Sequence, residues 1–142
     1  MRVVSTNNNI EIGDIYMINF AGDANEQRGW RPGVVFQNNT GNKFSPNIVA
    51  LPLTSSIKKS AQPTHVTIKA SDTGLRLDSM VLCENPETIS KNRLGRYVTS
   101  LPDSYMKQIA MANMLASSAI SFLSEDDVIR IWRKAATLNL PS

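Results

Sequence analysis

Two short β-strands joined by a polar turn are predicted for the stretch Gly29-Trp30-Arg31-Pro32-Gly33-Val34-Val35-Phe36-Gln37-Asn38, which continues through Gly41-Asn42-Lys43-Phe44-Ser45-Pro46 to Val49-Ala50-Leu51-Pro52-Leu53-Thr54. The apolar runs have the composition of buried strands, and residues 38–42 have the composition of a turn. Arg31 opens the first strand and Thr54 closes the second. In an antiparallel pair the start of one strand lies beside the end of the other, so this order brings a permanent positive charge and a hydroxyl to the same end of a small sheet.

Further strands and a helix are predicted around this stretch. Residues 13–20, 64–68 and 79–83 are rich in β-branched and other apolar residues, and residues 97–99 form a shorter strand after one helical turn at 90–94. Apolar and small residues then recur at helical spacing from Tyr105 to Leu123, after Pro102 and Asp103. We therefore expect a mainly β fold with α: a small, strongly bent barrel of about five to seven short strands, closed by a C-terminal helix.

An extra terminal helix is predicted from Ser124, because Ser124 and Asp127 match a capping box. Val128, Ile131 and Trp132 continue into Ala135 as an apolar stripe at i, i+3, i+4 and i+7. We expect this stripe to pack on the protein's own domain, and a partner-binding helix is the alternative. The resulting organisation is a tail over residues 1–10, one domain over 11–123 and a helical extension over 124–142.

Positive charge is concentrated in one part of the chain. The net charge is +3, yet residues 27–71 contain no Asp or Glu and carry +6, so the remainder carries −3. A polyanion-binding face would have this distribution, and so would an ordinary basic surface. The six cations are Arg28, Arg31, Lys43, Lys58, Lys59 and Lys69.

Several classes of protein and site are excluded by composition. One cysteine, Cys83, allows no internal disulfide, and its apolar neighbours indicate a buried structural thiol in a reducing cytoplasm. His65 lies in an alternating strand and is expected to be structural. One Cys and one His cannot build a zinc site, so we expect no metal and no cofactor. The chain has neither a secretory signal nor an apolar stretch long enough to span a bilayer, which predicts a soluble, cytoplasmic protein without membrane association.

Arg31 and Thr54 suit metal-free phosphodiester chemistry on RNA. RNA carries its own nucleophile, the 2′-hydroxyl, so an enzyme has to align the backbone and neutralise the charge on the phosphorane. The planar fork of Arg31 can bind two phosphate oxygens, and Thr54 can donate one hydrogen bond to them or to the leaving group. Glu26 is a candidate base, or it pairs with Arg28 or Arg31. By residue type alone, a surface arginine and a strand-end threonine are also ordinary.

The order of the fragments from Ile12 to Leu123 resembles the MazF/PemK family of endoribonuclease toxins. So many fragments in one order and at compatible spacing make chance an unsatisfactory explanation. The matching fragments are Gly13-Asp14-Ile15-Tyr16, Glu26-Gln27, Arg31-Pro32-Gly33-Val34-Val35, Gly41-Asn42-Lys43-Phe44-Ser45-Pro46, Leu53-Thr54, Pro63-Thr64-His65-Val66, Asp78-Ser79, Glu84 and Arg93-Leu94.

The resemblance implies an SH3-like barrel, a homodimer and a cognate MazE-like antitoxin. It also implies sequence-specific, metal-independent cleavage of single-stranded RNA to a 2′,3′-cyclic phosphate and a 5′-hydroxyl. Arg31 matches the family's catalytic arginine, and Thr54 matches its catalytic threonine. Residues 21–30 and 55–63 match loops that line the RNA groove. The residues expected to bind RNA are Gln27, Arg28, Ser55, Lys58 and Asn85.

The departures from the family pattern concern specificity and length. Trp30 replaces a small aliphatic residue, Arg28 often corresponds to glycine, and Asn85 replaces a longer amide, so the recognised base sequence stays open.

Two rival functions share the fold: a CcdB-like inhibitor of DNA gyrase, and an inactive binding module that docks through the extra helix. The gyrase inhibitors rely on a Trp-Gly-Ile chain end, which differs from the present end at residues 140–142. The Arg31–Thr54 pair favours the ribonuclease.

Overall fold

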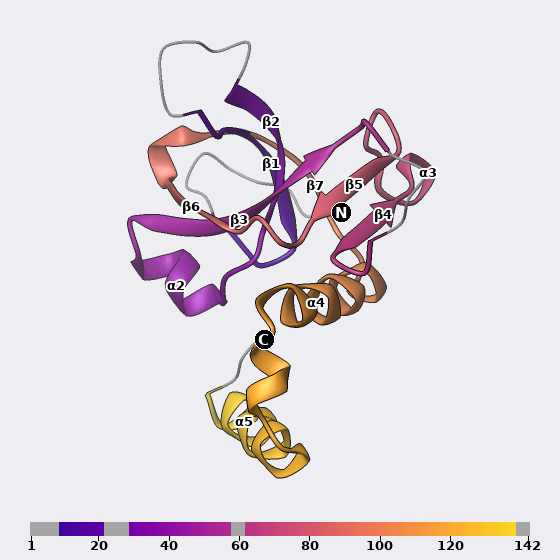
Figure 1. The fold of residues 1–142 in the computed structure, drawn as a ribbon. Helices are drawn as coiled ribbons and strands as arrows, with labels where there is room; N and C mark the ends of the chain where they lie inside the picture. The colour runs from indigo at the N-terminus through magenta and orange to yellow at the C-terminus, as the bar shows by residue number, and fades with distance from the viewer. Residues whose placement is uncertain (1–8, 22–28, 58–61, 139–142) are drawn as a thin grey trace.

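The protein is a curved antiparallel sheet with four helices, seen in a computed structural model that describes residues 9–21, 29–57 and 62–138 (Figure 1). The mainly β expectation is confirmed. The strands are β1 Asp14–Asn19, β2 Trp30–Val35, β3 Asn47–Thr54, β4 His65–Ile68, β5 Ser79–Leu82, β6 Glu87–Ser90 and β7 Leu94–Ser100. The helices are α2 Asn39–Phe44, α3 Ala70–Thr73, α4 Asp103–Ser117 and α5 Glu125–Thr137, with 3₁₀ turns η1 Lys91–Arg93 and η2 Ala119–Phe122.

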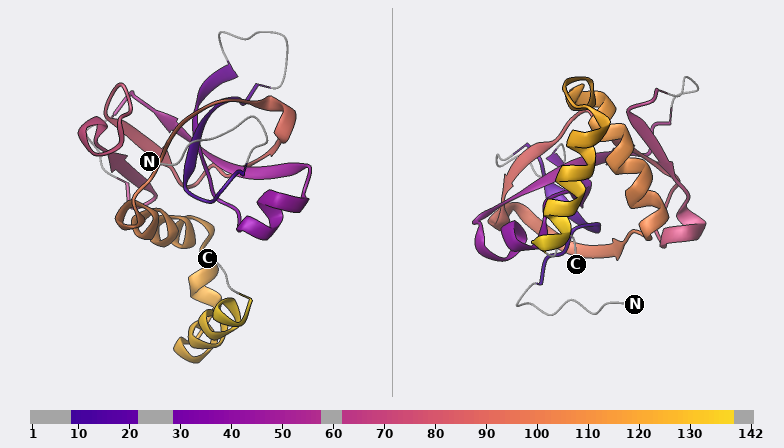
Figure 2. Two further views of the ribbon diagram at one scale, coloured as in Figure 1. Left: turned by 180° about the vertical axis from the view of Figure 1, so that it is seen from behind. Right: turned by 90° about the horizontal axis from the view of Figure 1, so that it is seen from below.

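The seven strands form one open sheet rather than a closed barrel. Their order is β4-β5-β3-β2-β1-β7, and β6 pairs with β3 away from this path. Strand β3 is therefore central, since it pairs with β2, β5 and β6. Within the described strands, β4 and β7 are the two ends of the order and do not pair with each other. Helix α4 packs beside β4 and buries Ile109 and Ala112, so a helix takes the place of strand closure (Figures 1 and 2).

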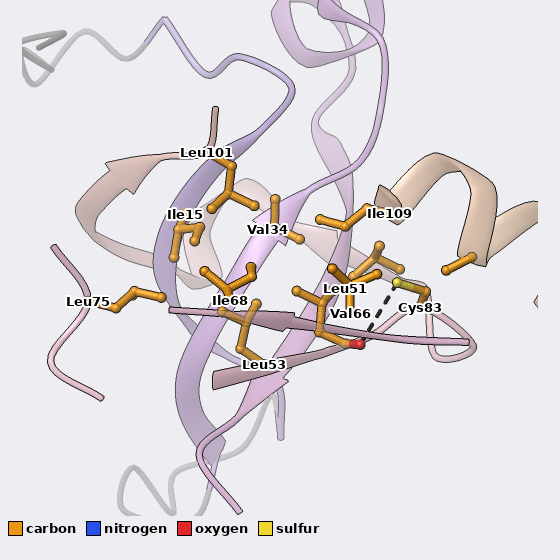
Figure 3. Close-up of a cluster of buried hydrophobic side chains, with 12 residues drawn as sticks. Ile15, Val34, Leu51, Leu53, Val66, Ile68, Leu75, Cys83, Leu101 and Ile109 are labelled. Atoms are coloured by element: carbon orange, nitrogen blue, oxygen red, sulfur yellow. Dashed lines mark hydrogen bonds between the residues drawn. The ribbon is translucent and has the colours of Figure 1, made fainter. Parts of the chain in front are cut away.

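Both faces of the curved sheet are buried, which explains the continuous apolar run in β2. Val34 and Leu51 belong to a cluster that lies between the sheet and α4 and includes Ile109 (Figure 3). Their chain neighbours Val35 and Ala50 belong to a second cluster. Successive residues of a strand point to opposite faces, so adjacent apolar residues are required wherever both faces are covered.

Two local predictions were wrong, and two short elements were not predicted. Residues 38–42, predicted as a turn, form the start of helix α2. The Asn38 side chain caps this helix by accepting a hydrogen bond from the Gly41 N–H at 2.9 Å, and the buried Asn42 side-chain amide donates to the Gln37 carbonyl at 2.8 Å. The short elements α3 and β6 were missed. The helix predicted to reach Leu123 ends at Ser117, because Ser118 adopts a left-handed conformation with φ 57°.

The extra helix forms where it was predicted, but its apolar stripe does not pack on the domain. Ser124 Oγ accepts from the Asp127 N–H at 3.2 Å, and Asp127 Oδ2 accepts from the Ser124 N–H at 2.9 Å, which completes the capping box. Ile131 is 55% exposed and Trp132 is 77% exposed. The expectation of packing was therefore wrong, since the chain turns at Ser118 and η2 and directs α5 away from the sheet (Figures 1 and 2). In the described part of the chain, no helix combines the length and the hydrophobicity needed to traverse a bilayer.

Candidate active site

The register of β2 and β3 brings Arg31 and Thr54 to the same end of the sheet. The paired residues are Gly33 with Pro52, Val34 with Leu51, and Val35 with Ala50. The pairing ends at Gly33 with Pro52, and Arg31 and Thr54 pair with Ile18 of β1 and Met80 of β5. The same register continued by two residues would put Arg31 level with Thr54. Residues opposite each other in an antiparallel pair face the same side of a sheet. We therefore expect the Arg31 and Thr54 side chains to face the same side of the sheet at this end.

The Arg31 side chain is exposed and available to a ligand. Its backbone is held in the β1–β2 ladder, where Arg31 pairs with Ile18. No other residue in the described ranges forms a hydrogen bond or a salt bridge with its guanidinium. Arg31 lines a cavity of about 290 Å³ together with Phe20 and Glu87. The cavity thus offers a cation, an aromatic ring and a carboxylate, which are groups that bind a phosphate, stack on a base and accept hydrogen bonds from base edges.

The Thr54 hydroxyl has a fixed position. Its Oγ1 accepts a hydrogen bond from the backbone N–H of Ser56 at 3.1 Å. This bond uses an oxygen lone pair and leaves the hydroxyl proton free to be donated. Ser55 is exposed and lines a second cavity of about 160 Å³ with Pro32 and Leu53. Since Arg31 and Pro32 are consecutive and line different cavities, the start of β2 lies between the two hollows.

Two hydrogen bonds from Arg93 hold the end of β1, which pairs with the start of β2 just before Arg31. The Arg93 Nε donates to the Asn19 carbonyl at 2.8 Å, and its Nη2 donates to the Phe20 carbonyl at 2.6 Å. The Phe20 N–H in turn donates to the Gly29 carbonyl at 2.8 Å and joins the ends of the β1–β2 connection. A Cβ at Gly29 would lie only 2.6 Å from the Ala21 Cβ, so this approach requires glycine. Arg31 follows Gly29 by two residues, and its position therefore depends on this junction.

Trp30, the bulky residue before Arg31, is accommodated by a glycine in β7. A Cβ at Gly95 would lie 2.7 Å from the Trp30 ring atom Cζ3 and 2.9 Å from the Met17 carbonyl oxygen. The indole therefore lies against the bare backbone of Gly95. A bulky residue next to Arg31 thus fits without displacing the strand.

The other predicted site residues are placed only in part. Glu26, Gln27, Arg28 and Lys58 lie outside the described residues. Asn85 is exposed in the turn between β5 and β6, where its N–H donates to the Leu82 carbonyl at 3.1 Å. Phe20, Glu87 and Arg93 were not among the site residues predicted from the sequence. Arg93 belonged to the family resemblance, which was the only available signal for it.

Cys83 is buried, as predicted, and His65 is largely buried beside Glu84. Burial, and to a smaller extent the nearby charge of Glu84, raises the pKa of the Cys83 thiol to about 12, so the thiolate nucleophile is absent at neutral pH. His65 Nε2 lies 2.6 Å from Glu84 Oε2, with only 12% of the histidine side chain exposed. In the ranges that the structure describes, no three His, Cys, Asp or Glu side chains gather in a way that could hold a metal ion.

Comparison with known proteins identifies the family. Residues 11–115 match the family of PemK-like, MazF-like toxins of type II toxin–antitoxin systems. The endoribonuclease MazF of Staphylococcus saprophyticus is 42% identical over 98 residues, which cover 68% of this chain and 82% of that protein. The endoribonuclease EndoA of Bacillus subtilis is 37% identical over 114 residues, which cover 80% of this chain and 98% of that protein.

A solved structure supports the same assignment. A mycobacterial endoribonuclease in complex with its cognate antitoxin superposes with a TM-score of 0.63 at 28% identity, covering 77% of this chain and 95% of that one. The family match spans well over half of the chain, and the relatives are matched over most of their own length. The chain therefore belongs to the family of PemK-like, MazF-like toxins of type II toxin–antitoxin systems.

Proposed function

We propose that this chain is the toxin of a toxin–antitoxin pair and acts as a sequence-specific endoribonuclease on single-stranded RNA. The observation that carries the proposal is the β2–β3 register, which brings Arg31 and Thr54 to one end of the sheet. The staphylococcal and Bacillus relatives are both named endoribonucleases, which supports the assignment. Family membership and this pair of residues together favour the nuclease over a CcdB-like gyrase inhibitor and over an inactive binding module.

In the proposed reaction, the RNA supplies the nucleophile and no metal takes part. The 2′-oxygen forms a bond to the adjacent phosphorus while the bond from phosphorus to the 5′-oxygen breaks. The 2′-hydroxyl loses a proton and the departing 5′-oxygen gains one, which yields a 2′,3′-cyclic phosphate and a 5′-hydroxyl. Arg31 binds the non-bridging oxygens through its fork and offsets the charge that develops on the phosphorane.

Thr54 and Glu26 complete the proposed machinery. The bond from the Ser56 N–H orients the Thr54 hydroxyl, whose proton is then donated to a non-bridging oxygen or to the leaving group. Glu26 is proposed to accept the proton of the 2′-hydroxyl. Pairing of Glu26 with Arg28 or Arg31 is the alternative role.

The RNA chain is proposed to cross the start of β2, between the two cavities. Its backbone follows the basic segment 27–71, and its bases are read by stacking and by contacts to their edges. The cavity beside Arg31 offers Phe20 for stacking and Glu87 as an acceptor. The proposed RNA contacts remain Gln27, Arg28, Ser55, Lys58 and Asn85.

The proposed partners follow from the family. The mycobacterial relative was solved with its cognate antitoxin, and we propose a MazE-like antitoxin for this chain as well. We further propose that residues 11–123 form the toxin domain, that this domain forms a homodimer, and that the protein works in the cytoplasm.

The test is RNA cleavage in EDTA by purified, antitoxin-free protein, with the cut ends mapped. Arg31→Ala is expected to lower the cleavage rate by about 10²–10³-fold, as the loss of a donor to a developing oxyanion does. Thr54→Ala should also be strongly impaired, while Thr54→Ser keeps the hydroxyl and should retain most activity. Thr40→Ala, an exposed threonine in α2, is the matched control and should cleave like wild type. If folded wild type leaves several long RNAs intact, the ribonuclease assignment is wrong.

A further inference from the structure

The cavity of about 160 Å³ that Ser55 lines lies directly beside the proposed reacting groups. Its walls come from the start of β2 at Pro32, the end of β3 at Leu53, and the connection between α3 and β5, which lies next to the end of β3 (Figure 1). In the chain, Pro32 follows Arg31 and Ser55 follows Thr54. RNA held by the reacting pair therefore has this cavity within its reach.

By strand alternation, the cavity and the Arg31 side chain lie on opposite faces of the β2–β3 pair. Successive residues of a strand point to opposite faces, so Pro32 and Leu53 face away from the side of Arg31. Leu53 accordingly belongs to the core cluster between the sheet and α4, whereas Arg31 lines the other cavity with Phe20. The bases of single-stranded RNA can be splayed out, so two nucleotides joined by a phosphate at this strand end can enter different cavities.

The lining of the cavity suits a single base ring. Its walls include the apolar side chains of Leu53, Leu75 and Leu77. An apolar protein cavity of about 150 Å³ holds one benzene ring. A volume of about 160 Å³ therefore fits the six-membered ring of a pyrimidine more closely than the fused rings of a purine. The exposed Ser55 supplies a hydroxyl that can donate to or accept from the edge of a base.

The connection between α3 and β5 is anchored on both sides of Arg76 and Leu77. Gly74 ends α3 in a left-handed conformation with φ 78°, and its N–H donates to the Ala70 carbonyl at 2.9 Å. On the other side, Asp78 Oδ1 accepts from the Ala70 N–H at 2.8 Å. An anchored connection loses little conformational entropy when a ligand binds, which favours a preformed site.

Arg76 and Leu77 are both exposed at the cavity, and both are available to a ligand. Leu77 is 58% exposed although it lines an apolar cavity. Within the described ranges, no residue forms a hydrogen bond or a salt bridge with the Arg76 guanidinium. The acidic neighbours Asp72 and Asp78 bond instead to the Tyr105 hydroxyl and to the backbone of α3. A free arginine and an exposed leucine at one cavity suit a ligand that combines an anionic group with an apolar ring, and a nucleotide has both.

We propose that this cavity is a nucleotide subsite, in which Leu77 packs against a pyrimidine base that flanks the cut bond and Arg76 binds a phosphate next to the one that is cut. The inference rests on the proposed ribonuclease function, and it adds two residues that lie outside the basic segment 27–71. The two roles are separable, since a phosphate contact strengthens binding to every sequence, whereas a base contact determines which sequence is preferred.

Cleavage of RNAs that are randomised around the mapped cut tests the base contact. Wild type should prefer a pyrimidine at one position flanking the cut, and Leu77→Ser should reduce this preference by about tenfold, as the loss of a contact to one base does. Preferences at the other positions should be unchanged. Ile131→Ser is the matched control, because Ile131 is 55% exposed and lies on α5, at the far end of the molecule from the start of β2 (Figures 1 and 2).

Binding of an RNA with a 2′-deoxynucleotide at the cut position tests the phosphate contact without cleavage. Arg76→Gln should weaken this binding several-fold and reduce the slope of log affinity against log salt by about 0.7. Arg76→Lys keeps the charge and should restore most of the slope. Cleavage at saturating RNA should be unchanged in Arg76→Gln, since Arg76 does not touch the cut phosphate. Arg133→Gln, at an exposed arginine of α5, is the matched control, and circular dichroism should be the same for all these proteins.

The outcomes separate this inference from the proposed function. If wild type cuts RNA while Leu77→Ser and Arg76→Gln behave like their controls, the subsite is wrong and the ribonuclease assignment stands. If wild type cuts no RNA, both fail. A flanking preference for a purine that Leu77→Ser removes would overturn the pyrimidine assignment. Variants that act like wild type on RNA but bind the MazE-like antitoxin less tightly would assign the cavity to the antitoxin instead.

Discussion

Because Arg93 holds the end of β1 through two hydrogen bonds, a substitution at this position, outside the Arg31–Thr54 pair, should lower both the stability of the fold and the rate of RNA cleavage. Arg93→Met removes both donors to the carbonyls of Asn19 and Phe20 and retains most of the apolar stem. The two carbonyls then have to find water at a half-buried position. Asn19 pairs with Trp30, directly before Arg31, so the substitution also loosens the strand end that carries the guanidinium.

The magnitude follows from the two hydrogen bonds, which measure 2.8 and 2.6 Å. Hydrogen bonds to charged groups contribute about 1.5–3 kcal/mol each, and partial exposure of Arg93 favours the lower end, so the expected loss of unfolding free energy is about 3 kcal/mol. For a chain of 142 residues, the unfolding entropy is about 0.3 kcal/mol/K, which converts this loss into a fall in Tm of about 10 °C. A displacement of Arg31 by about 1 Å would lower the cleavage rate by about 10²-fold even where the protein is folded.

The assay combines urea unfolding with RNA cleavage in a Trp132→Phe background. The chain has two tryptophans, so this background leaves Trp30 as the only indole and makes its fluorescence a reporter of the strand end. Arg93→Lys retains a charge but cannot reach both carbonyls with a fork, and it should fall between Arg93→Met and wild type. Arg130→Met, at an exposed arginine of α5, is the matched control. A Tm for Arg93→Met within about 2 °C of wild type, with full cleavage, would refute the fastening role.

Three further outcomes are expected. Ile109→Ala, at a fully buried core position, should lower the unfolding free energy by about 2–5 kcal/mol in urea titrations, and a loss below this range would mean that the core refills around the cavity. Since the pKa of Cys83 is raised to about 12, iodoacetamide at pH 8 should modify Cys83 only after unfolding, and mass spectrometry of the native protein would reveal any contrary labelling. Hydrogen bonds from Ser124 lower the pKa of the Asp127 carboxyl, so the cap of α5 should be intact above the ordinary aspartate pKa and should be lost as the pH falls through the lowered pKa. Circular dichroism should show this loss of helix. Ser124→Ala should weaken the helix and reduce its pH dependence.

The sequence predicted the elements whose signals are local and failed where distant segments decide. The strands around Val34 and Leu51 have long apolar runs, and the start of α5 has a capping box, so both were found. Strand β6 was missed because Glu87–Ser90 is short and polar, and only its pairing with β3 makes it a strand. The turn expected at Asn38 was in fact a helix start, since the same side-chain hydrogen bonds serve turns and helix caps.

The candidate site could be predicted only as far as strand order determines it. Arg31 lies near the start of β2 and Thr54 at the end of the neighbouring antiparallel strand β3, so strand order alone puts both at the same end of the sheet. Phe20 and Glu87 come together with Arg31 through separate strands, and Arg93 reaches Asn19 across 74 residues of sequence. No local pattern encodes such a contact. The packing of α5 was also beyond local prediction, because an apolar stripe indicates that a helix has a partner without indicating which one.

The concentration of positive charge in one part of the chain has a measurable consequence. The proposed RNA-binding end belongs to the segment 27–71, which carries +6. RNA binding releases counterions and therefore weakens steeply as the salt concentration rises, with a slope of about 0.7 per neutralised phosphate on a single strand. Arg31→Ala should remove one phosphate contact, so it should weaken RNA binding and reduce the slope of log affinity against log salt by about 0.7. An affinity of the wild type that does not change with salt would show that the basic segment does not hold the RNA backbone, and an unchanged slope for Arg31→Ala would show that the guanidinium does not bind a phosphate.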